Sequence, residues 1–217
     1  MSLIVFNGSP RGKNSNSNII AHWFLEGYNK SNTPVRYLNK VNRHDDLAKE
    51  MTAYKKIVFV FPLYVDGMPG QVKHFFEMLD SYKKDLQGKN VTYIIHCGFS
   101  EAIHCRNLEK YLNRYASIMG FKNYGVIVIP GSEGFKIMPP YMTKKKRLAT
   151  SRLGSEFNSS KPYNLTDLRI LSGKEKMSKT DILVFSILSK VGLTNMYWNS
   201  SLKKNKVFDK RFDAPYE

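Results

Sequence analysis

Apolar and polar positions alternate along the chain in blocks that predict a repeated order of strand and helix. Five short runs are apolar almost throughout and rich in Val, Ile, Phe and Tyr, which is typical of strands covered on both faces. The predicted strands are Leu3–Phe6, Val35–Leu38, Ile57–Phe61, Val91–Ile95 and Tyr124–Ile129. Segments with the apolar spacing of helices lie between them, so each strand is expected to run parallel to its neighbours.

The helical segments share a stripe of apolar residues on one face. The stripes are Ile19, Ile20, Trp23 and Phe24; Leu47, Met51 and Tyr54; Val72, Phe75, Phe76 and Leu79; Leu108, Leu112, Tyr115 and Met119; and Ala149, Leu153 and Phe157. Pro69 stands at the start of the third helix, where its missing N–H costs nothing, and Gly120 ends the fourth. The alternation predicts an α/β fold with a five-stranded parallel sheet and helices on both faces. Periodicity does not reveal the order of the strands.

The pattern changes after about residue 160, which predicts a domain over residues 1–160 and a C-terminal extension over 161–217. The most apolar run of the extension, Ile182–Leu193, is interrupted by Ser186, Ser189 and Lys190. It is shorter than the roughly 20 residues that span a bilayer, so we expect no membrane span. The extension is expected to pack on the core or on a partner subunit, and this run is a candidate for part of a homodimer interface.

The 217 residues carry a formal net charge of +16, which raises the question of a polyanionic partner. Basic residues are spread along the chain, and no basic stripe alternates with aromatic residues as base stacking would require. We therefore expect no nucleic-acid partner, and a basic nucleic-acid-binding domain remains as a third alternative. The only cysteines are Cys97 and Cys105, with no CxxC, so neither a metal site nor a disulfide framework is expected. The low cysteine content, and a first strand that no basic leader precedes, predict a cytoplasmic protein. Both thiols are then expected to be small buried apolar groups.

The first candidate site follows the first strand. Gly8–Ser17 is a loop of Gly, Ser, Asn and Arg that runs directly into a helix. Unpaired N–H groups and the helix dipole favour an anion at such a helix start, and Arg11 adds a cationic fork suited to phosphate. The loop lacks the Gly-x-Gly-x-x-Gly spacing of dinucleotide folds and the Gly-Lys-Ser/Thr ending of a P-loop. It predicts a site for a phosphorylated ligand.

Two further loops are expected at the same edge of the sheet. The first is Pro62–Gly70, in which Pro62 stops the strand and Leu63, Tyr64 and Met68 offer large side chains. The second is His96–Glu101, where Gly98 allows close approach of the backbone and Phe99 offers a flat wall. Ligands of open α/β sheets bind at the carboxyl ends of the strands, so the three loops together predict a site for a phosphate that carries a flat ring.

These motifs resemble the NAD(P)H-dependent FMN reductase family, flavodoxin-like flavoproteins that include quinone reductases and iron–sulfur flavoproteins. The resemblance covers residues 1–130 and rests on Gly8–Arg11 with Asn16-Ser17, on Pro62–Pro69 and on Gly98-Phe99. It implies a flavodoxin-like fold, bound FMN, NADPH or NADH as electron donor, a small-molecule electron acceptor and a homodimer or higher homo-oligomer. The cysteine cluster of the iron–sulfur members is absent from this sequence, so no cluster-based relay is expected.

The resemblance also implies which residues bind the cofactor. The phosphate would be held by Ser9, Arg11, Asn16 and Ser17, and the ribityl chain and ring by Pro62, Leu63, Tyr64, Val65, Asp66, Gly67 and Met68 on one side and Gly98, Phe99 and Glu101 on the other. No catalytic dyad is needed, because the flavin supplies the chemistry. His96, at a strand end, is the one candidate donor to the flavin or to a substrate, and a packed or solvated histidine is the alternative.

The implied function is therefore an FMN-dependent NAD(P)H oxidoreductase that passes hydride to a quinone, a nitro or azo compound, or a flavin. The alternative is a flavodoxin-like electron carrier, or a flavin-binding regulator, without a substrate of its own. Short flavodoxins tend to be acidic and lack such a tail, so the charge of +16 and the extension argue against a plain carrier.

Overall fold

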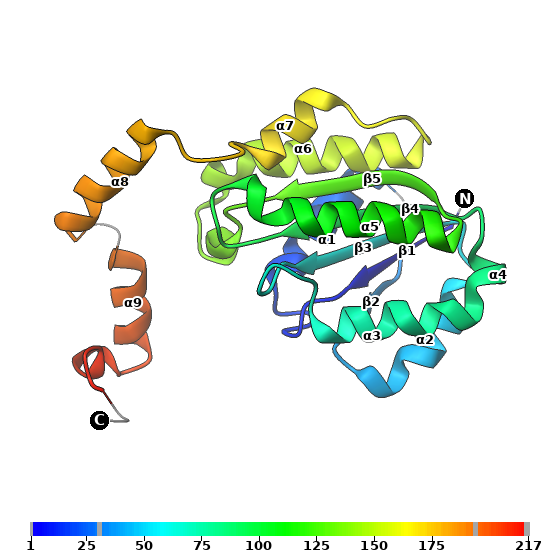
Figure 1. Ribbon diagram of the computed structural model, residues 1–217, viewed down its shortest axis with the longest axis horizontal. Helices are drawn as coiled ribbons and strands as arrows, with labels where there is room; N and C mark the ends of the chain where they lie inside the picture. Colours follow the sequence, from blue (N-terminus) through cyan, green and yellow to red (C-terminus); the bar gives the residue numbers. More distant parts are fainter. Residues whose placement is uncertain (1, 30–31, 193–194, 215–217) are drawn as a thin grey trace. The chain divides into compact units, whose positions relative to one another are not determined.

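The computed structural model describes residues 2–29, 32–192 and 195–214. The chain forms two compact units, Met1–Lys176 and Met177–Glu217. The first unit holds the parallel sheet (Figure 1), whose strands are β1 (Leu3–Asn7), β2 (Val35–Tyr37), β3 (Lys56–Pro62), β4 (Asn90–His96) and β5 (Lys122–Ile129). They pair in the order β2-β1-β3-β4-β5, and every pairing is parallel.

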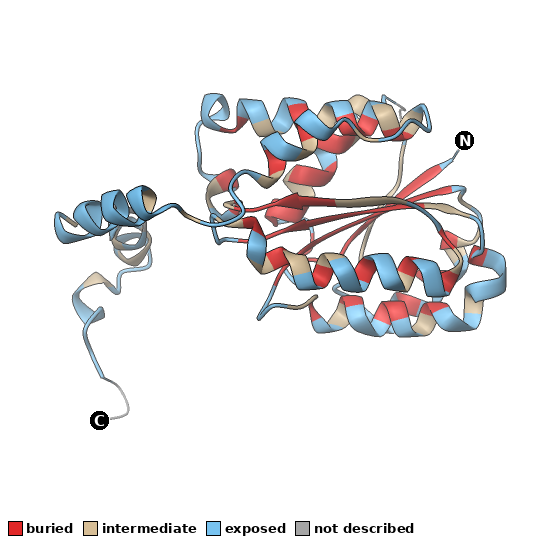
Figure 2. Ribbon diagram, turned by 45° about the horizontal axis from the view of Figure 1, so that its top comes forward, coloured by how far each residue is buried: buried red, intermediate tan, exposed pale blue. Residues whose placement is uncertain are grey.

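Helices cover both faces of this sheet. The helices of the first unit are α1 (Asn16–Tyr28), α2 (His44–Met51), α3 (Gly70–Met78), α4 (Lys83–Leu86), α5 (Arg106–Met119), α6 (Pro140–Asn158) and α7 (Leu165–Ser172). Single 3₁₀ turns are η1 (Val41–Arg43), η2 (Leu79–Tyr82), η3 (Ala102–Cys105) and η4 (Glu133–Lys136). One buried cluster joins the sheet to α2, α3 and α5, and the other joins its opposite face to α1, α6 and α7, as the buried inner faces in Figure 2 show.

The sequence pattern explains why the core lies where it does. The side chains of β3 are buried at every position, from Lys56 to Pro62, because this central strand has a helical layer on each side. Lys56 is the one charged residue of that strand, and its Nζ donates to the carbonyl oxygens of Phe157 and Asn158 at the end of α6. A cation at a helix C-terminus is favourable, since it meets carbonyls that the helix leaves without partners.

Two glycines let α1 and α6 approach closely. A Cβ added to Gly154 of α6 would overlap the carbonyl oxygen of Phe24, and one added to Gly27 of α1 would overlap the carbonyl oxygen of Ser151. The helices therefore meet backbone to backbone, with Leu153 and Phe157 buried beside the crossing. This contact fixes α1, whose first turn belongs to the site described below.

The second unit contains α8 (Lys179–Lys190), α9 (Met196–Lys204) and η6 (Phe208–Lys210). α8 begins with a capping box, in which the Ser178 hydroxyl accepts from the Asp181 amide and the Asp181 carboxylate accepts from the Ser178 amide. None of the residues of α8, all of which the structure describes, is buried. Its apolar side chains are 39–61% exposed from Ile182 to Leu188, and Val191, which follows the helix, is 65% exposed.

The predicted α/β fold, with a five-stranded parallel sheet and helices on both faces, is confirmed. The predicted division near residue 160 differs from the observed one after Lys176, because α7 belongs to the first unit. Leu171 of α7 is fully buried, and Asp167 pairs with Arg152 of α6. The predicted Ile182–Leu193 segment corresponds to α8, although Leu193 itself lies outside the described residues. Within the part of the chain that the structure describes, no helix combines the length and the apolar character needed to cross a membrane.

The glycine contact predicts a large effect of one methyl group. Gly154→Ala is expected to lower the free energy of unfolding by about 2–3 kcal/mol, because the new Cβ forces α1 and α6 apart and overpacking costs that much. Gly70→Ala is the matched control, since nothing lies within 4 Å of the Cβ that it would add. Denaturant unfolding of both variants measures the effect, and equal stability of the two would contradict the close crossing.

Candidate functional site at the carboxyl edge of the sheet

The predicted site loops follow β1, β3 and β4, which lie side by side in the sheet. The helices after β1 and β3 cover opposite faces, so the edge opens between these strands, as at other ligand sites of α/β sheets. Gln71 at the start of α3 donates through Nε2 to the Gly8 carbonyl at 3.0 Å. A Cβ on Gly8 would overlap Val72, so the two loops are in close contact.

Buried polar side chains shape the loop after β1 from inside. Asn7 Nδ2 donates to the Gly12 carbonyl and to Ser15 Oγ, both at 3.2 Å, and Asn7 Oδ1 accepts from the Ser9 amide at 2.9 Å. Gly12 takes φ +56°, a conformation that favours glycine. Ser15 caps α1 by accepting from the Asn18 amide at 3.2 Å. The loop therefore has a defined shape that ends in a helix N-terminus.

The groups that this loop offers to an anion are backbone amides, Ser9 and Arg11. The first amides of α1, from Asn16 and Ser17, have no carbonyl one turn earlier in the helix with which to bond. The Ser9 hydroxyl accepts from the Arg11 amide at 3.3 Å, which leaves its own proton free to donate. The Arg11 side chain is exposed, and no ion pair is recorded for it within the described part of the chain. This donor set suits a phosphate.

The side chains of Asn16 and Ser17 point to other protein groups. Asn16 Nδ2 donates to the carbonyls of Ser132 at 2.8 Å and Glu133 at 3.1 Å, just after β5. Ser17 Oγ lies 2.7 Å from Nε2 of His96, at the end of β4. Both residues are buried. The structure thus brings them to the predicted loop, with their side chains engaged in tying that loop to its neighbours.

His96 lies at the centre of this arrangement. Its Nδ1 lies 2.8 Å from Ser132 Oγ, which itself donates to the Cys97 carbonyl at 3.0 Å. Ser132 must then accept from Nδ1–H, which assigns the other ring nitrogen, Nε2, as the acceptor of the Ser17 hydroxyl proton. Burial, with a smaller effect of the Arg11 charge, lowers the pKa of His96 to about 3. Both nitrogens of this neutral ring are occupied by protein hydroxyls, so the structure gives His96 the packed role and not that of a donor to a ligand.

The loop after β3 contains a tight, strained turn. The backbones of Tyr64 and Gly67 exchange hydrogen bonds of 2.9 and 3.0 Å, and Val65 and Asp66 between them have φ of +47° and +57°. A β-branched residue is rare in this conformation, and such strain tends to occur at functional sites. Val65 is 101% exposed. Pro62 and Leu63 are buried below the turn, and Met68 is half-buried.

The loop after β4 presents an aromatic ring at the surface. Phe99 is 57% exposed and stacks on His104, with ring centroids 4.2 Å apart. Its carbonyl accepts from the Gly131 amide at 2.6 Å, which ties the loop to the one after β5. Glu101 Oε2 lies 3.5 Å from His104 Nε2. A Cβ added to Gly98 would lie 3.7 Å from the Glu133 Cβ, which is an ordinary van der Waals contact. No close packing within the chain therefore requires a glycine at this position.

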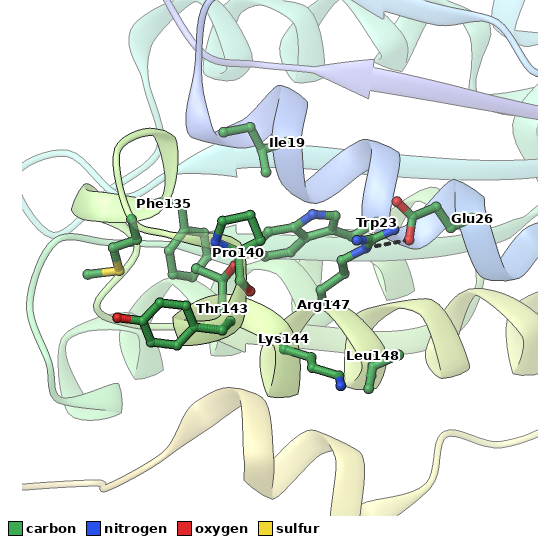
Figure 3. Close-up of a pocket in the computed structure, with 11 residues that line it drawn as sticks. Ile19, Trp23, Glu26, Phe135, Pro140, Thr143, Lys144, Arg147 and Leu148 are labelled. Atoms are coloured by element: carbon green, nitrogen blue, oxygen red, sulfur yellow. Dashed lines mark hydrogen bonds and ion pairs between the residues drawn. The ribbon is translucent and has the colours of Figure 1, made fainter.

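A hollow of about 660 Å³ lies beside α1 in the first unit (Figure 3). Trp23 and Phe135 form its aromatic floor with ring centroids 5.1 Å apart, and Arg147 Nε pairs with Glu26 at 2.9 Å on its rim. Tyr141 adds an exposed ring. The sequence pattern does not indicate this hollow, because its residues come from separate segments that the fold brings together.

Comparisons with known proteins agree with this fold. Residues 1–151 match the family described as having a flavodoxin-like fold, and the chain belongs to that family. No curated protein matches the sequence.

Solved structures with the same fold include the Trp repressor binding protein from Bacillus subtilis, with 17% identity, a TM-score of 0.57 and coverage of 70% of this chain and 97% of that one. Another is an FMN-dependent NADH-azoreductase from Bacillus anthracis in complex with FMN, with 15% identity, a TM-score of 0.54 and coverage of 74% and 99%. A third is the NAD(P)H:quinone oxidoreductase from Methanothermobacter marburgensis, with 14% identity, a TM-score of 0.56 and coverage of 72% and 96%.

The buried histidine predicts a pH dependence of stability. The folded pKa of His96, about 3, lies below the ordinary histidine value of 6.5, so the unfolded chain binds more protons between these values. Its contribution is complete above about pH 6.5 and decreases as the pH falls toward 3. The free energy of unfolding that His96 loses between pH 7 and pH 5 is at most about 2 kcal/mol.

The variant His96→Gln, which does not titrate, is expected to lose less stability than the wild type over this interval. Denaturant unfolding at both pH values measures the difference. Burial also lowers the pKa of His44, but this residue is present in both proteins, so its effect cancels in the comparison. Equal losses in the two proteins would show that His96 is not held neutral.

Proposed function

We propose that this protein is an FMN-dependent NAD(P)H oxidoreductase with its cofactor at the carboxyl edge of the sheet. One observation carries the proposal: a capped helix N-terminus with Ser9 and Arg11 lies beside a strained exposed turn, on the same edge as the Phe99 loop. An anion site next to exposed flat side chains suits a monophosphate that carries an aromatic ring. The named activities of two proteins with the same fold support this choice.

In this proposal, the loop after β1 binds the phosphate of FMN. Backbone amides at the start of α1, the Ser9 hydroxyl and the Arg11 guanidinium donate to the phosphate oxygens. Asn16 and Ser17 contribute their amides, while their side chains hold the loop against β4 and β5. Because these bonds are buried, the amides are oriented before the ligand arrives, which reduces the cost of binding.

The ring of FMN would lie between the other two loops. Tyr64 is 42% exposed and Phe99 57%, so each has apolar surface available for a flat ligand. The turn from Val65 to Gly67 brings backbone groups to the surface, where they can bond to the edge of the ring. Met68 and Glu101 complete the two walls, and Pro62, Leu63 and Gly98 form the backbone beneath them.

FMN supplies the redox chemistry when bound, by accepting hydride from a nicotinamide and passing electrons on. The protein needs only to hold the ring and leave one face open for NADPH or NADH and then for the acceptor. We propose a small acceptor, such as a quinone, a nitro or azo compound or free flavin, in the cytoplasm. The chain's net charge of +16 favours the approach of phosphorylated ligands in general.

Spectroscopy on the purified protein tests this function. We expect a yellow protein, or one that takes up FMN, whose visible absorbance bleaches when NADPH or NADH is added without oxygen. Adding a quinone should restore the absorbance. A protein that does not bind FMN would refute the proposal, and one that binds FMN without bleaching would instead be a carrier or a flavin-binding regulator.

Arg11 is the most direct point at which to weaken the cofactor. Arg11→Ala is expected to raise the Kd for FMN about 10–100-fold, since a hydrogen bond to a charged group contributes about 1.5–3 kcal/mol. The exposed Arg114 of α5 provides a control, because Arg114→Ala changes the net charge equally and lies away from the three loops. Fluorescence titration with FMN measures both, and equal weakening would indicate a general charge effect.

We also propose that the protein is a homodimer or higher homo-oligomer in which α8 forms part of the interface. Leu183, Ile187 and Val191 follow one another at four-residue spacing, and each is more than half exposed. An apolar helix stripe of this kind is normally covered in a folded protein. A second copy of the chain carries the same stripe and can cover it symmetrically.

The double variant Leu183→Asp/Ile187→Asp is expected to be a monomer, because two buried carboxylates would face their counterparts across the interface. Ser186→Asp/Ser189→Asp adds the same charge on the polar side of α8 and should leave the oligomer intact. Light scattering after size-exclusion chromatography gives the mass of each. A monomeric wild type would contradict the proposal.

A further inference from the structure

Cys97 and Cys105 lie in direct contact. Cys105 Sγ donates to Cys97 Sγ at 3.7 Å, and both thiols are free and buried. Cys97 follows β4 immediately, and Cys105 is the last residue of η3 and precedes α5. No other cysteine is present in the sequence, so this contact involves the chain's entire thiol content.

The segment between the two cysteines folds back on itself. Phe99 stacks on His104 with ring centroids 4.2 Å apart, and Glu101 lies 3.5 Å from the same imidazole. The Phe99 carbonyl is held by the Gly131 amide at 2.6 Å, and the Cys97 carbonyl by the Ser132 amide at 2.9 Å. These contacts keep the ends of the segment together, as a disulfide between residues eight positions apart requires.

The two thiols are chemically unequal. The hydrogen bond from Cys105, backbone hydrogen bonds at Phe99 and Gly131, and the charge of Lys146 lower the pKa of Cys97 against the effect of burial. The hydrogen bond to Cys97 and burial raise the pKa of Cys105. Lys146 is fixed near Cys97 by its own hydrogen bond to the Pro130 carbonyl at 2.5 Å. A thiol whose pKa is lowered, in contact with a second thiol, is the arrangement of redox-sensitive cysteine pairs.

We propose that Cys97 and Cys105 form a reversible intramolecular disulfide when the protein meets a peroxide. In the first step the Cys97 thiol loses its proton, its thiolate attacks one oxygen of the peroxide, an S–O bond forms, the O–O bond breaks, and the leaving hydroxide takes up that proton to become water. In the second step Cys105 sulfur attacks Cys97 sulfur, the S–S bond forms, and the hydroxyl leaves as water with the Cys105 proton. Two thiols are oxidised and one hydrogen peroxide is reduced to two waters. Two equivalents of a small thiol then reduce the disulfide back to the two cysteine thiols by exchange, and the small thiol is itself oxidised to its disulfide.

The disulfide would close a ring around Gly98–His104, the segment that carries Phe99 and Glu101. If FMN lies where we propose, this bond would fix the wall on one side of its ring. That consequence rests on the proposed function, whereas the disulfide itself depends only on the two thiols. Oxidation and FMN binding are therefore tested separately.

Mapping of the thiols in the full-length protein tests the disulfide. The reduced protein is treated with hydrogen peroxide, then denatured, alkylated and digested for mass spectrometry. We expect loss of both alkylatable thiols, a cross-linked peptide pair containing Cys97 and Cys105 with two hydrogens fewer, and full recovery after dithiothreitol. This readout requires neither bound FMN nor activity, so its failure is distinct from failure of the proposed function.

Single variants separate the roles of the two thiols. In Cys105→Ser, the oxidised Cys97 should persist as a sulfenic acid that dimedone traps, because no second thiol resolves it. In Cys97→Ser, Cys105 should remain a free thiol under the same treatment. The proposal is overturned if both wild-type thiols stay alkylatable, if Cys97 passes to sulfinic acid without a cross-link, or if the disulfide joins two copies of the chain. The wild-type mapping decides these outcomes whether or not a variant folds.

Discussion

A neutral histidine held between two serine hydroxyls connects two loops of the candidate site, those after β1 and β4, to the segment after β5. His96 ends β4, Ser17 lies in the first turn of α1, and Ser132 follows β5. Water does not reach this ring, so a charge on it would be costly, and burial lowers the pKa of His96 to about 3. Loops from three strands thereby become one structure, and the start of α1 is fixed relative to β4.

The fixed helix start explains how a polar loop can be ready for a ligand before the ligand arrives. Asn7 holds the loop from inside, and the Asn16 side-chain amide donates to the Ser132 carbonyl just after β5. Farther along, α1 is held by the crossing at Gly27 and Gly154. Polar groups that are paired in this way cannot turn away, which leaves the backbone amides, Ser9 and Arg11 to meet an anion.

Much of the fold could be predicted from the sequence, because β3 and β4 read as apolar runs and the helices between them carry clear stripes. The boundary of the first unit was harder to predict. α7 is short, and its link to the core depends on Leu171 and on the Arg152–Asp167 pair, which periodicity does not reveal. The strand order was also hidden, since it follows from crossovers and not from any single segment.

The candidate site was predictable to the level of loops. The Gly8–Ser17 and Pro62–Gly70 motifs come to one edge, as parallel strands require. The directions of side chains were not predictable, because Ser17 meets His96 at the end of β4 and Asn16 meets Ser132 just after β5, and these contacts depend on the strand order. The same holds for the contact of Cys97 with Cys105, which depends on how the Phe99 loop folds back.

We propose that the three loops at the carboxyl edge bind FMN. Hydrogen–deuterium exchange of the purified protein with and without FMN tests this proposal, because it reports on backbone amides. Protection is expected over residues 9–17, 63–68 and 98–101, with the strongest effect at the start of α1. Unchanged exchange in these segments, or protection confined to the hollow around Trp23, Phe135 and Tyr141, would contradict the account.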